Sequence, residues 1–209
     1  MRNILIMILL FSPVLISAQR FNGGILAGVD FCQVDGDDNS GYHKIGLLAG
    51  GLVSLRVSPH SSFQMELSYI QKGSKGTDTI NFSSDFLMRF GYLEVPLLYQ
   101  YTFLKRLSVE AGPAMDVLLS SYEERDGSPV PENYVEPMRN VTLSGILGFS
   151  GYISKHLKAN FRFNYSILSI RKPTDTPPAD YRYIFWQKGQ FNNVISISLM
   201  WYFKPNPDL

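Results

Sequence analysis

The chain has 209 residues, which suits one domain after removal of an export signal. Its 19 Lys and Arg against 18 Asp and Glu leave it nearly neutral, and this argues against a nucleic-acid partner, which requires a basic surface. The 12 Tyr and 14 Phe favour a β-rich protein. Cys32 is the single cysteine, so an internal disulfide is excluded and we expect a buried free thiol.

The amino terminus has the pattern of a signal peptide over residues 1–18. Arg2 precedes an apolar run over residues 4–11, and the small Ala18 precedes the polar Gln19. No Cys follows this expected cleavage position, which argues against a lipid anchor there. Neither this run nor a later one is long enough for a transmembrane helix, so a membrane-spanning mature chain requires a closed β-barrel.

Eight segments of the mature chain alternate apolar and mixed side chains. In residues 92–103, odd positions such as Leu93, Val95 and Tyr99 are apolar or aromatic, whereas even positions include Glu94 and Gln100. A strand directs successive side chains to opposite faces, and each segment is long enough to cross a bilayer at a tilt. The predicted strands are 21–33, 44–57, 62–72, 92–103 (with a start as early as Phe86), 107–120, 141–153, 157–169 and 190–203.

The connectors between these segments alternate in length. Residues 58–61, 104–106 and 154–156 form short turns, and residues 34–43, 73–85, 121–140 and 170–189 form long polar loops. This alternation is typical of outer-membrane barrels. We therefore predict an all-β fold: an eight-stranded antiparallel transmembrane up-and-down β-barrel over residues 19–203, with a short tail over 204–209. Both termini are expected in the periplasm.

Charged side chains gather on the face opposite the apolar one. An eight-stranded barrel is just wide enough for its own side chains, so buried charges must pair and a plugged lumen is expected. A turn at residues 104–106 places Glu94 opposite Asp116, and Arg56 and Arg162 are the preferred bridges between such carboxylates. The predicted lumen charge network comprises Arg56, Glu66, Lys72, Glu94, Glu110, Asp116, Lys158 and Arg162.

Aromatic residues cluster at the ends of the predicted strands. Rings at both strand ends suit the headgroup levels of a bilayer. The expected girdle at the short-turn end comprises Phe21, Phe63, Tyr101, Phe103, Trp201 and Phe203, and Phe31, Tyr69, Tyr165 and Phe191 fall toward the long-loop end. Pro96 and Pro113 lie inside two neighbouring strands and predict a weak point or bulge at mid-depth, because proline cannot donate to the ladder.

The sequence offers little for catalysis or metal binding. His60 and His156 fall in short turns, and His43 closes the first long loop near the acidic run Asp35, Asp37, Asp38 and Asn39. That run lacks the spacing of a complete Ca²⁺ loop, so a solvated turn is the better interpretation. We expect no enzymatic activity, no metal and no cofactor.

Four short motifs carry a family resemblance: residues 21–28, 66–73, 92–98 and 110–113. Together they resemble the PorT-like outer-membrane β-barrel family, and the resemblance covers the mature chain to Phe203. It implies an eight-stranded barrel in a gram-negative outer membrane, among outer-membrane lipid, with envelope protein partners reached through the long loops. Some PorT-like proteins serve type IX secretion, which suggests a non-enzymatic scaffold or an accessory of a secretion or surface complex. Two alternatives stay open: a small barrel hydrolase acting on lipid or peptide, and a soluble secreted lipocalin-like ligand binder.

Overall fold

The structure is a computed structural model. It describes residues 21–37, 41–76, 86–172, 177, 179 and 181–207. The predicted signal peptide lies outside the described residues, as do Asp38 and Asn39 of the acidic run. Among the described residues, no helix is long and apolar enough to cross a bilayer.

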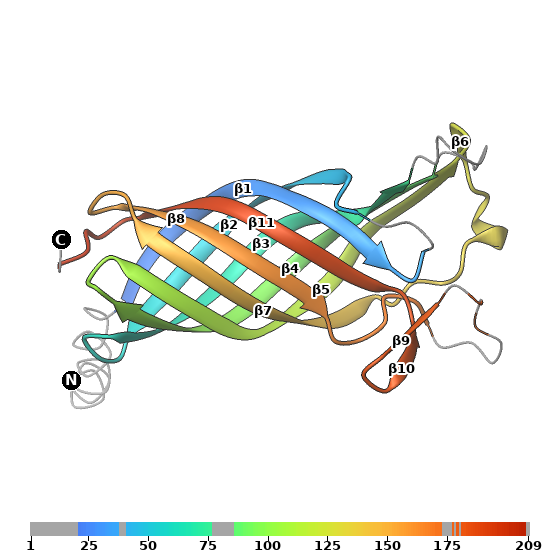
Figure 1. The fold of residues 1–209 in the computed structure, drawn as a ribbon. Helices are drawn as coiled ribbons and strands as arrows, with labels where there is room; N and C mark the ends of the chain where they lie inside the picture. Colours follow the sequence, from blue (N-terminus) through green and yellow to red (C-terminus); the bar gives the residue numbers. More distant parts are fainter. Residues whose placement is uncertain are drawn as a thin grey trace, which may run out of the picture.

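Eight long antiparallel strands close into a barrel, which confirms the predicted fold (Figure 1). Each strand pairs with its sequence neighbours in the barrel, and the ring closes where β1 pairs with β11. β1 begins and β11 ends at the short-turn end (Figure 1). The strands are β1 (Phe21–Asp35), β2 (Lys44–Arg56), β3 (Ser61–Gly76), β4 (Phe86–Phe103), β5 (Leu107–Arg125), β7 (Val141–Tyr152), β8 (Leu157–Ser166) and β11 (Phe191–Tyr202).

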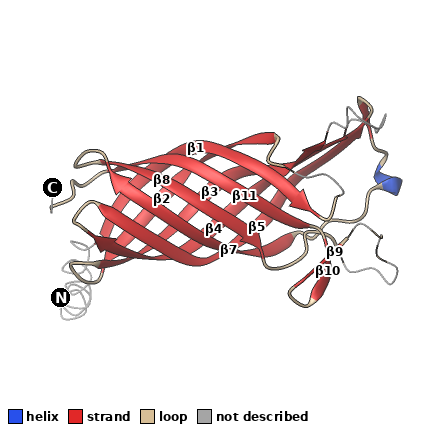
Figure 2. Cartoon of the chain, viewed as in Figure 1, coloured by secondary structure: helices blue, strands red, loops and turns tan. Residues whose placement is uncertain are grey.

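The long-loop end contains more regular structure than expected (Figure 2). Pairing of β4 with β5 continues to Phe86, the earliest predicted start of that strand, and to Arg125, beyond the predicted end of the next strand at Ser120. The two longest predicted loops also contain β6 (Ser128–Pro129), the 3₁₀ helix η2 (Glu132–Tyr134) and a separate hairpin of β9 (Arg182–Ile184) and β10 (Gln187–Gly189). The polar composition of these segments led to the prediction of loops. Backbone hydrogen bonding between strands does not depend on side-chain polarity, so strands can continue through polar segments.

The two faces of the wall differ as the alternation predicts. Leu47, Leu67 and Leu147 are 59%, 56% and 63% exposed on the outside, whereas Glu66 and Glu110 are 2% and 3% exposed on the inside. The apolar band therefore faces outward and the charges face the lumen. This arrangement is the reverse of a soluble lipocalin-like barrel, which places its apolar face inside.

The two prolines interrupt the ladder, and the bulge lies elsewhere. Pairing of β4 with β5 runs to Pro96 and Ala114 and resumes at Tyr99 and Ala111 without a change of register. A register shift occurs instead between Gly91 and Tyr92, toward the long-loop end. The predicted weak point is thus an unpaired stretch, because a missing proline N–H removes a ladder bond without adding a residue.

The short C-terminal tail packs against the barrel mouth. The amide of Lys204 donates to Asn22 Oδ1 at 3.0 Å, and Asn22 Nδ2 donates to the carbonyl of Lys204 at 2.9 Å. Further along, the amide of Asn206 donates to the carbonyl of Lys155 in the last short turn. The described part of the tail therefore lines the short-turn mouth.

Candidate functional site

An arginine crosses the lumen near the middle of the barrel. Arg162 on β8 donates from Nη1 and Nη2 to both carboxylate oxygens of Glu66 on β3, at 2.7 and 2.6 Å. Its Nε donates to Glu110 on β5 at 2.5 Å. In the closed ring of eight strands, β3 and β8 stand opposite each other. The Arg162–Glu66 pair therefore spans the diameter of the barrel.

Neutral side chains complete this first cluster. Asn160 Nδ2 and Gln100 Nε2 donate to the two oxygens of Glu110 at 2.9 and 2.7 Å. Gln64 Nε2 donates to Glu66 at 2.5 Å, and Gln64 Oε1 accepts from the Tyr202 hydroxyl at 2.7 Å. Buried charges need such saturation, because an unpaired charge in the interior carries a large desolvation cost.

A second cluster lies toward the long-loop end. Glu94 on β4 faces Asp116 on β5 in the ladder, the register that the short turn implies. Lys72 on β3 joins them, with Nζ 2.7 Å from Glu94 and 2.9 Å from Asp116. Asn164 donates to Glu94 at 2.7 Å and Ser144 to Asp116 at 3.0 Å. The cluster thereby connects β3, β4, β5, β7 and β8.

Two members of the predicted network lie outside both clusters. Arg56 is half-buried at the short-turn mouth, where it donates to the carbonyls of Ser58 and Pro59 at 3.3 and 3.0 Å. The expected bridge between Glu94 and Asp116 is therefore Lys72 instead of an arginine, because β2 ends at Arg56, far from that level. Lys158 is buried, and its Nζ lies 5.2 Å from the centre of the Tyr152 ring.

An apolar cluster and a further ion pair also lie inside the barrel. Leu48, Leu52 and Ile70 are buried, and at the long-loop end Phe90 and Ile170 join the same cluster. Arg171 there pairs with Glu123 at 2.6 Å. This pair was not predicted, because both residues fall in predicted loops, where no inward or outward face can be assigned.

Two further buried charges were also missed. Asp30 and Lys44 are 0% and 5% exposed and face inward from β1 and β2. Both occupy inward positions of strands that were predicted to within two residues, so the alternation itself was sufficient to find them. Lys44 Nζ donates to the backbone carbonyl of Gln71 at 3.4 Å. Near it, the thiol of Cys32 is fully buried, as expected.

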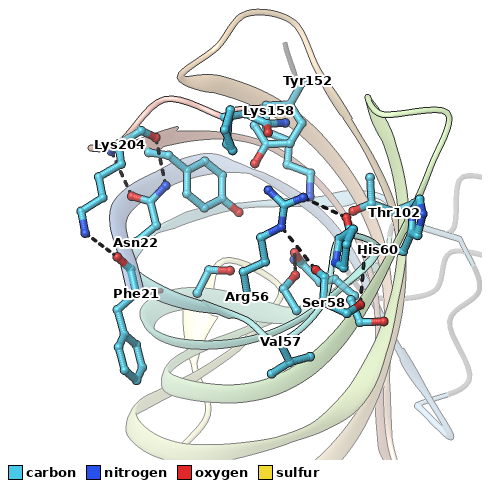
Figure 3. Close-up of a pocket in the computed structure, with 18 of the residues that line it drawn as sticks. Phe21, Asn22, Arg56, Val57, Ser58, His60, Thr102, Tyr152, Lys158 and Lys204 are labelled. Carbon is cyan, nitrogen blue, oxygen red and sulfur yellow. Dashed lines mark hydrogen bonds between the residues drawn. The ribbon is translucent and has the colours of Figure 1, made fainter. Parts of the chain in front are cut away.

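A cavity of about 590 Å³ occupies the short-turn mouth. Figure 3 shows Arg56 in the middle of this mouth, between Lys204 and Asn22 on one side and His60 and Thr102 on the other. Gln100 and Tyr202 also line the cavity, and both bond to the first ion-pair cluster through Glu110 and Gln64. The cavity is thus a vestibule that leads to the Arg162 cluster.

The predicted girdle residues lie on the outer wall at the short-turn end. Five of the six are exposed by 42–62%, and Phe103 is half-buried beside Phe149. At the long-loop end the outcome is mixed, because Phe191 is fully buried and stacks on Tyr165 with ring centroids 6.5 Å apart. Aromatic identity alone does not reveal which rings the loops cover.

The histidines form no catalytic arrangement within the described residues. The Nδ1 atoms of His60 and His156 lie within hydrogen-bond distance of backbone carbonyls of Thr102 and Tyr202, at 3.1 and 2.8 Å. Asp35 accepts from Gln33 and Tyr165, so its carboxylate is engaged by protein donors. No group of three or more His, Cys, Asp or Glu in the described part of the chain is placed to hold a metal ion.

Several solved barrels have a similar fold. Ail, the attachment invasion locus protein of Yersinia pestis, crystallised with the heparin analogue sucrose octasulfate, is 10% identical with a TM-score of 0.47, covering 88% of this chain and 99% of that chain. Neisserial surface protein A (NspA) is 11% identical with a TM-score of 0.48, covering 88% and 96%. OprG from Pseudomonas aeruginosa is 12% identical with a TM-score of 0.38, covering 88% and 94%.

No curated protein matches the chain at a significant level. A family model does match: the outer membrane protein beta-barrel domain aligns with residues 17–171, which is most of the chain. The match agrees with the closed ring of strands, the outward apolar band and the charged interior. The chain belongs to the outer membrane protein beta-barrel domain family and is an outer-membrane β-barrel protein.

Proposed function

We propose that this protein is of the PorT-like type and acts, without enzymatic activity, as a membrane scaffold or as an accessory of a secretion or surface complex. The observation that carries the proposal is the salt bridge between Arg162 and Glu66, which joins opposite walls of the barrel. We infer that this crossing pair, together with the second ion-pair cluster of Lys72, Glu94 and Asp116, closes the lumen to solutes. The protein then acts through its surfaces.

The PorT-like assignment rests on the motifs over residues 66–73 and 92–98. The structure gives these motifs a physical role, because Glu66, Lys72 and Glu94 within them supply three of the paired lumen charges. The arrangement also supports a non-enzymatic role, since the carboxylates nearest the vestibule are held by Arg162 and by amide donors. A catalytic carboxylate requires access to a substrate.

The proposal places both termini in the periplasm and the long loops outside the cell, after removal of the signal peptide over residues 1–18. Asp126 lies in the turn after β5 at the long-loop end, and His60 lies in a short turn. A single cysteine at each position, in a Cys32→Ser background, tests the orientation. A membrane-impermeant thiol reagent on intact cells should label position 126 and spare position 60, and the reverse result contradicts the orientation.

Partner contact is tested with a photo-crosslinking residue at the outer loops. Tyr134 in η2 is 80% exposed at the long-loop end, and Leu104 in a short turn is 78% exposed at the other end. The scaffold role predicts a discrete crosslinked envelope protein from position 134 in living cells. Position 104 serves as the matched control at the periplasmic end. If neither position crosslinks to a protein, the accessory role is contradicted while the barrel fold stands.

A further inference from the structure

The β9–β10 hairpin carries an aromatic tip that contacts little of the protein. Tyr183, Phe185 and Trp186 are 72%, 57% and 65% exposed. The rings of Phe185 and Trp186 lie next to each other, with centroids 5.6 Å apart. Exposed aromatic clusters of this kind mark contact surfaces, because leaving them in water is unfavourable.

The turn of this hairpin contains residue types that are unusual in two-residue turns. Ile184 pairs with Gln187, so Phe185 and Trp186 are the two residues of the turn. Phe185 has a φ of 54°, a left-handed conformation for which glycine is preferred at this position. A bulky residue there is costly, and its side chain stays 57% exposed. Residues that are unfavourable for their backbone conformation are found mostly at functional sites.

The base of the hairpin is fixed, in contrast to its tip. Gly36 at the end of β1 has a φ of 90°, and a Cβ there would lie 2.7 Å from the carbonyl oxygen of Gly189 and 3.0 Å from the amide of Arg182. Gln190 Nε2 donates to the carbonyl of Gly36 at 3.0 Å. The barrel thus holds the hairpin in one direction.

The hairpin is directed to one side of the barrel. In Figure 1 the hairpin lies to one side of the long-loop end, whereas β6 and the end of β5 project away from the barrel. A column of stacked rings connects its base with the lipid-facing wall: Phe163 stacks on Tyr165 at 6.1 Å, and Tyr165 on Phe191 at 6.5 Å. The hairpin therefore continues the outer surface at the level where the barrel strands end.

We propose that the β9–β10 hairpin is an anchor that inserts Tyr183, Phe185 and Trp186 into the headgroup region of the outer leaflet. Tyr and Trp prefer this region, since their rings are amphipathic. Lys188 pairs with Tyr183 across the hairpin, and Arg182 pairs with Gly189, so two cations accompany the rings. Their charge suits the anionic phosphate groups of lipid headgroups. A lipid surface matches both features of the hairpin.

Tryptophan fluorescence tests the anchor, because the chain has only two Trp residues. Trp201→Phe leaves Trp186 as the sole reporter, and Trp186→Phe leaves Trp201, which is 47% exposed in the girdle at the other end. Both variants are refolded into phosphatidylcholine vesicles with and without phosphatidylglycerol, and folding is checked by the heat-modifiable gel shift. Emission is then measured with brominated phosphatidylcholine and with iodide.

The anchor predicts blue-shifted Trp186 emission and quenching by brominated lipid comparable to that of Trp201. Replacing Arg182 and Lys188 with Gln should reduce this quenching in vesicles with phosphatidylglycerol and leave it unchanged in pure phosphatidylcholine. Strong iodide quenching of Trp186 without quenching by brominated lipid overturns the proposal. Protection from both quenchers also overturns it, because the tip then packs against protein. Neither result bears on the scaffold role.

Discussion

At the scale of single residues, Arg162 makes the most consequential contacts in the lumen. From β8 it holds Glu66 on β3 and Glu110 on β5, and all three side chains are nearly inaccessible to solvent. Removing one partner of a buried ion pair leaves uncompensated charge, which typically costs more than the pair itself contributes. Arg162 is therefore the position where a single substitution most directly tests the interior.

We predict that Arg162→Met lowers the free energy of unfolding by about 3–5 kcal/mol, because two carboxylates lose their counter-charge. Adding Glu66→Gln and Glu110→Gln should restore most of the loss, since the buried charges are then gone. Urea titration in lipid vesicles measures both. A single variant within about 0.5 kcal/mol of the wild type would show that the lumen solvates these carboxylates without Arg162.

The lipid-facing assignment leads to a second prediction at this scale. Leu67 is 56% exposed on β3 between the aromatic Phe63 and Tyr69, whereas Leu104 is 78% exposed in a short turn. Leu67→Lys should destabilise the inserted barrel by roughly 2–4 kcal/mol and Leu104→Lys by roughly 0–1 kcal/mol, because the penalty for a charge falls with distance from the midplane. Equal penalties in the same titration would contradict the membrane-facing band.

At the scale of elements, most strand ends were predictable from the sequence to within a few residues. Apolar and polar side chains alternate up to Arg56 and again from Phe63. This alternation is visible in the sequence because one face of each strand is buried inside the barrel. The extension of β5 to Arg125 was not predictable from the sequence. Beyond the membrane neither face of a strand needs apolar side chains, so the apolar–polar alternation that marks a strand is absent there. The same reason explains why the Arg171–Glu123 pair and the β9–β10 hairpin were missed.

The unpaired stretch at the prolines depends on a close backbone approach. A Cβ at Gly112 would lie 2.0 Å from the backbone carbonyl oxygen of Leu97, whereas the nearest atom to a Cβ at Gly145 is a side-chain carbon of Ile167 at 3.7 Å. We predict that Gly112→Ala destabilises the barrel by about 1–3 kcal/mol through overpacking. Gly145→Ala, the matched control, should be neutral or stabilising by roughly 0.4–1 kcal/mol. Thermal unfolding followed by the gel shift compares them, and equal behaviour would show that β4 and β5 are free to separate here.

At the scale of the whole molecule, the parity of charges along five of the predicted strands was enough to predict a charged interior, but not its pairing, and the plug stays a prediction. The register of β4 and β5 follows from a short turn, so Glu94 opposite Asp116 was accessible from the sequence. Which cation reaches them depends on strand stagger around the ring. Lys72 reaches them from β3, whereas Arg56 lies at the mouth, and no local pattern distinguishes these two outcomes.

If the ion-pair clusters close the lumen, removing Arg162 should open it to ions. Arg162→Ala removes the side chain that crosses from β8 to β3, and should convert a closed barrel into one with measurable ion current. Arg56→Ala, at the vestibule, removes the same charge from a side chain that donates to the carbonyls of Ser58 and Pro59, and should leave the barrel closed. Current through both variants or through neither would show that Arg162 is not the element that closes the lumen.

We infer that the ion-pair clusters close the lumen of the native protein, and single-channel recording in planar bilayers tests this closure. Purified wild-type barrel, with insertion verified by protease protection in matched vesicles, is added to a bilayer in symmetric salt. The closed lumen predicts no steady current above the bare bilayer across the range of applied voltage. A large, steady open-channel current from the wild-type barrel would contradict the plug and with it the scaffold role built on it.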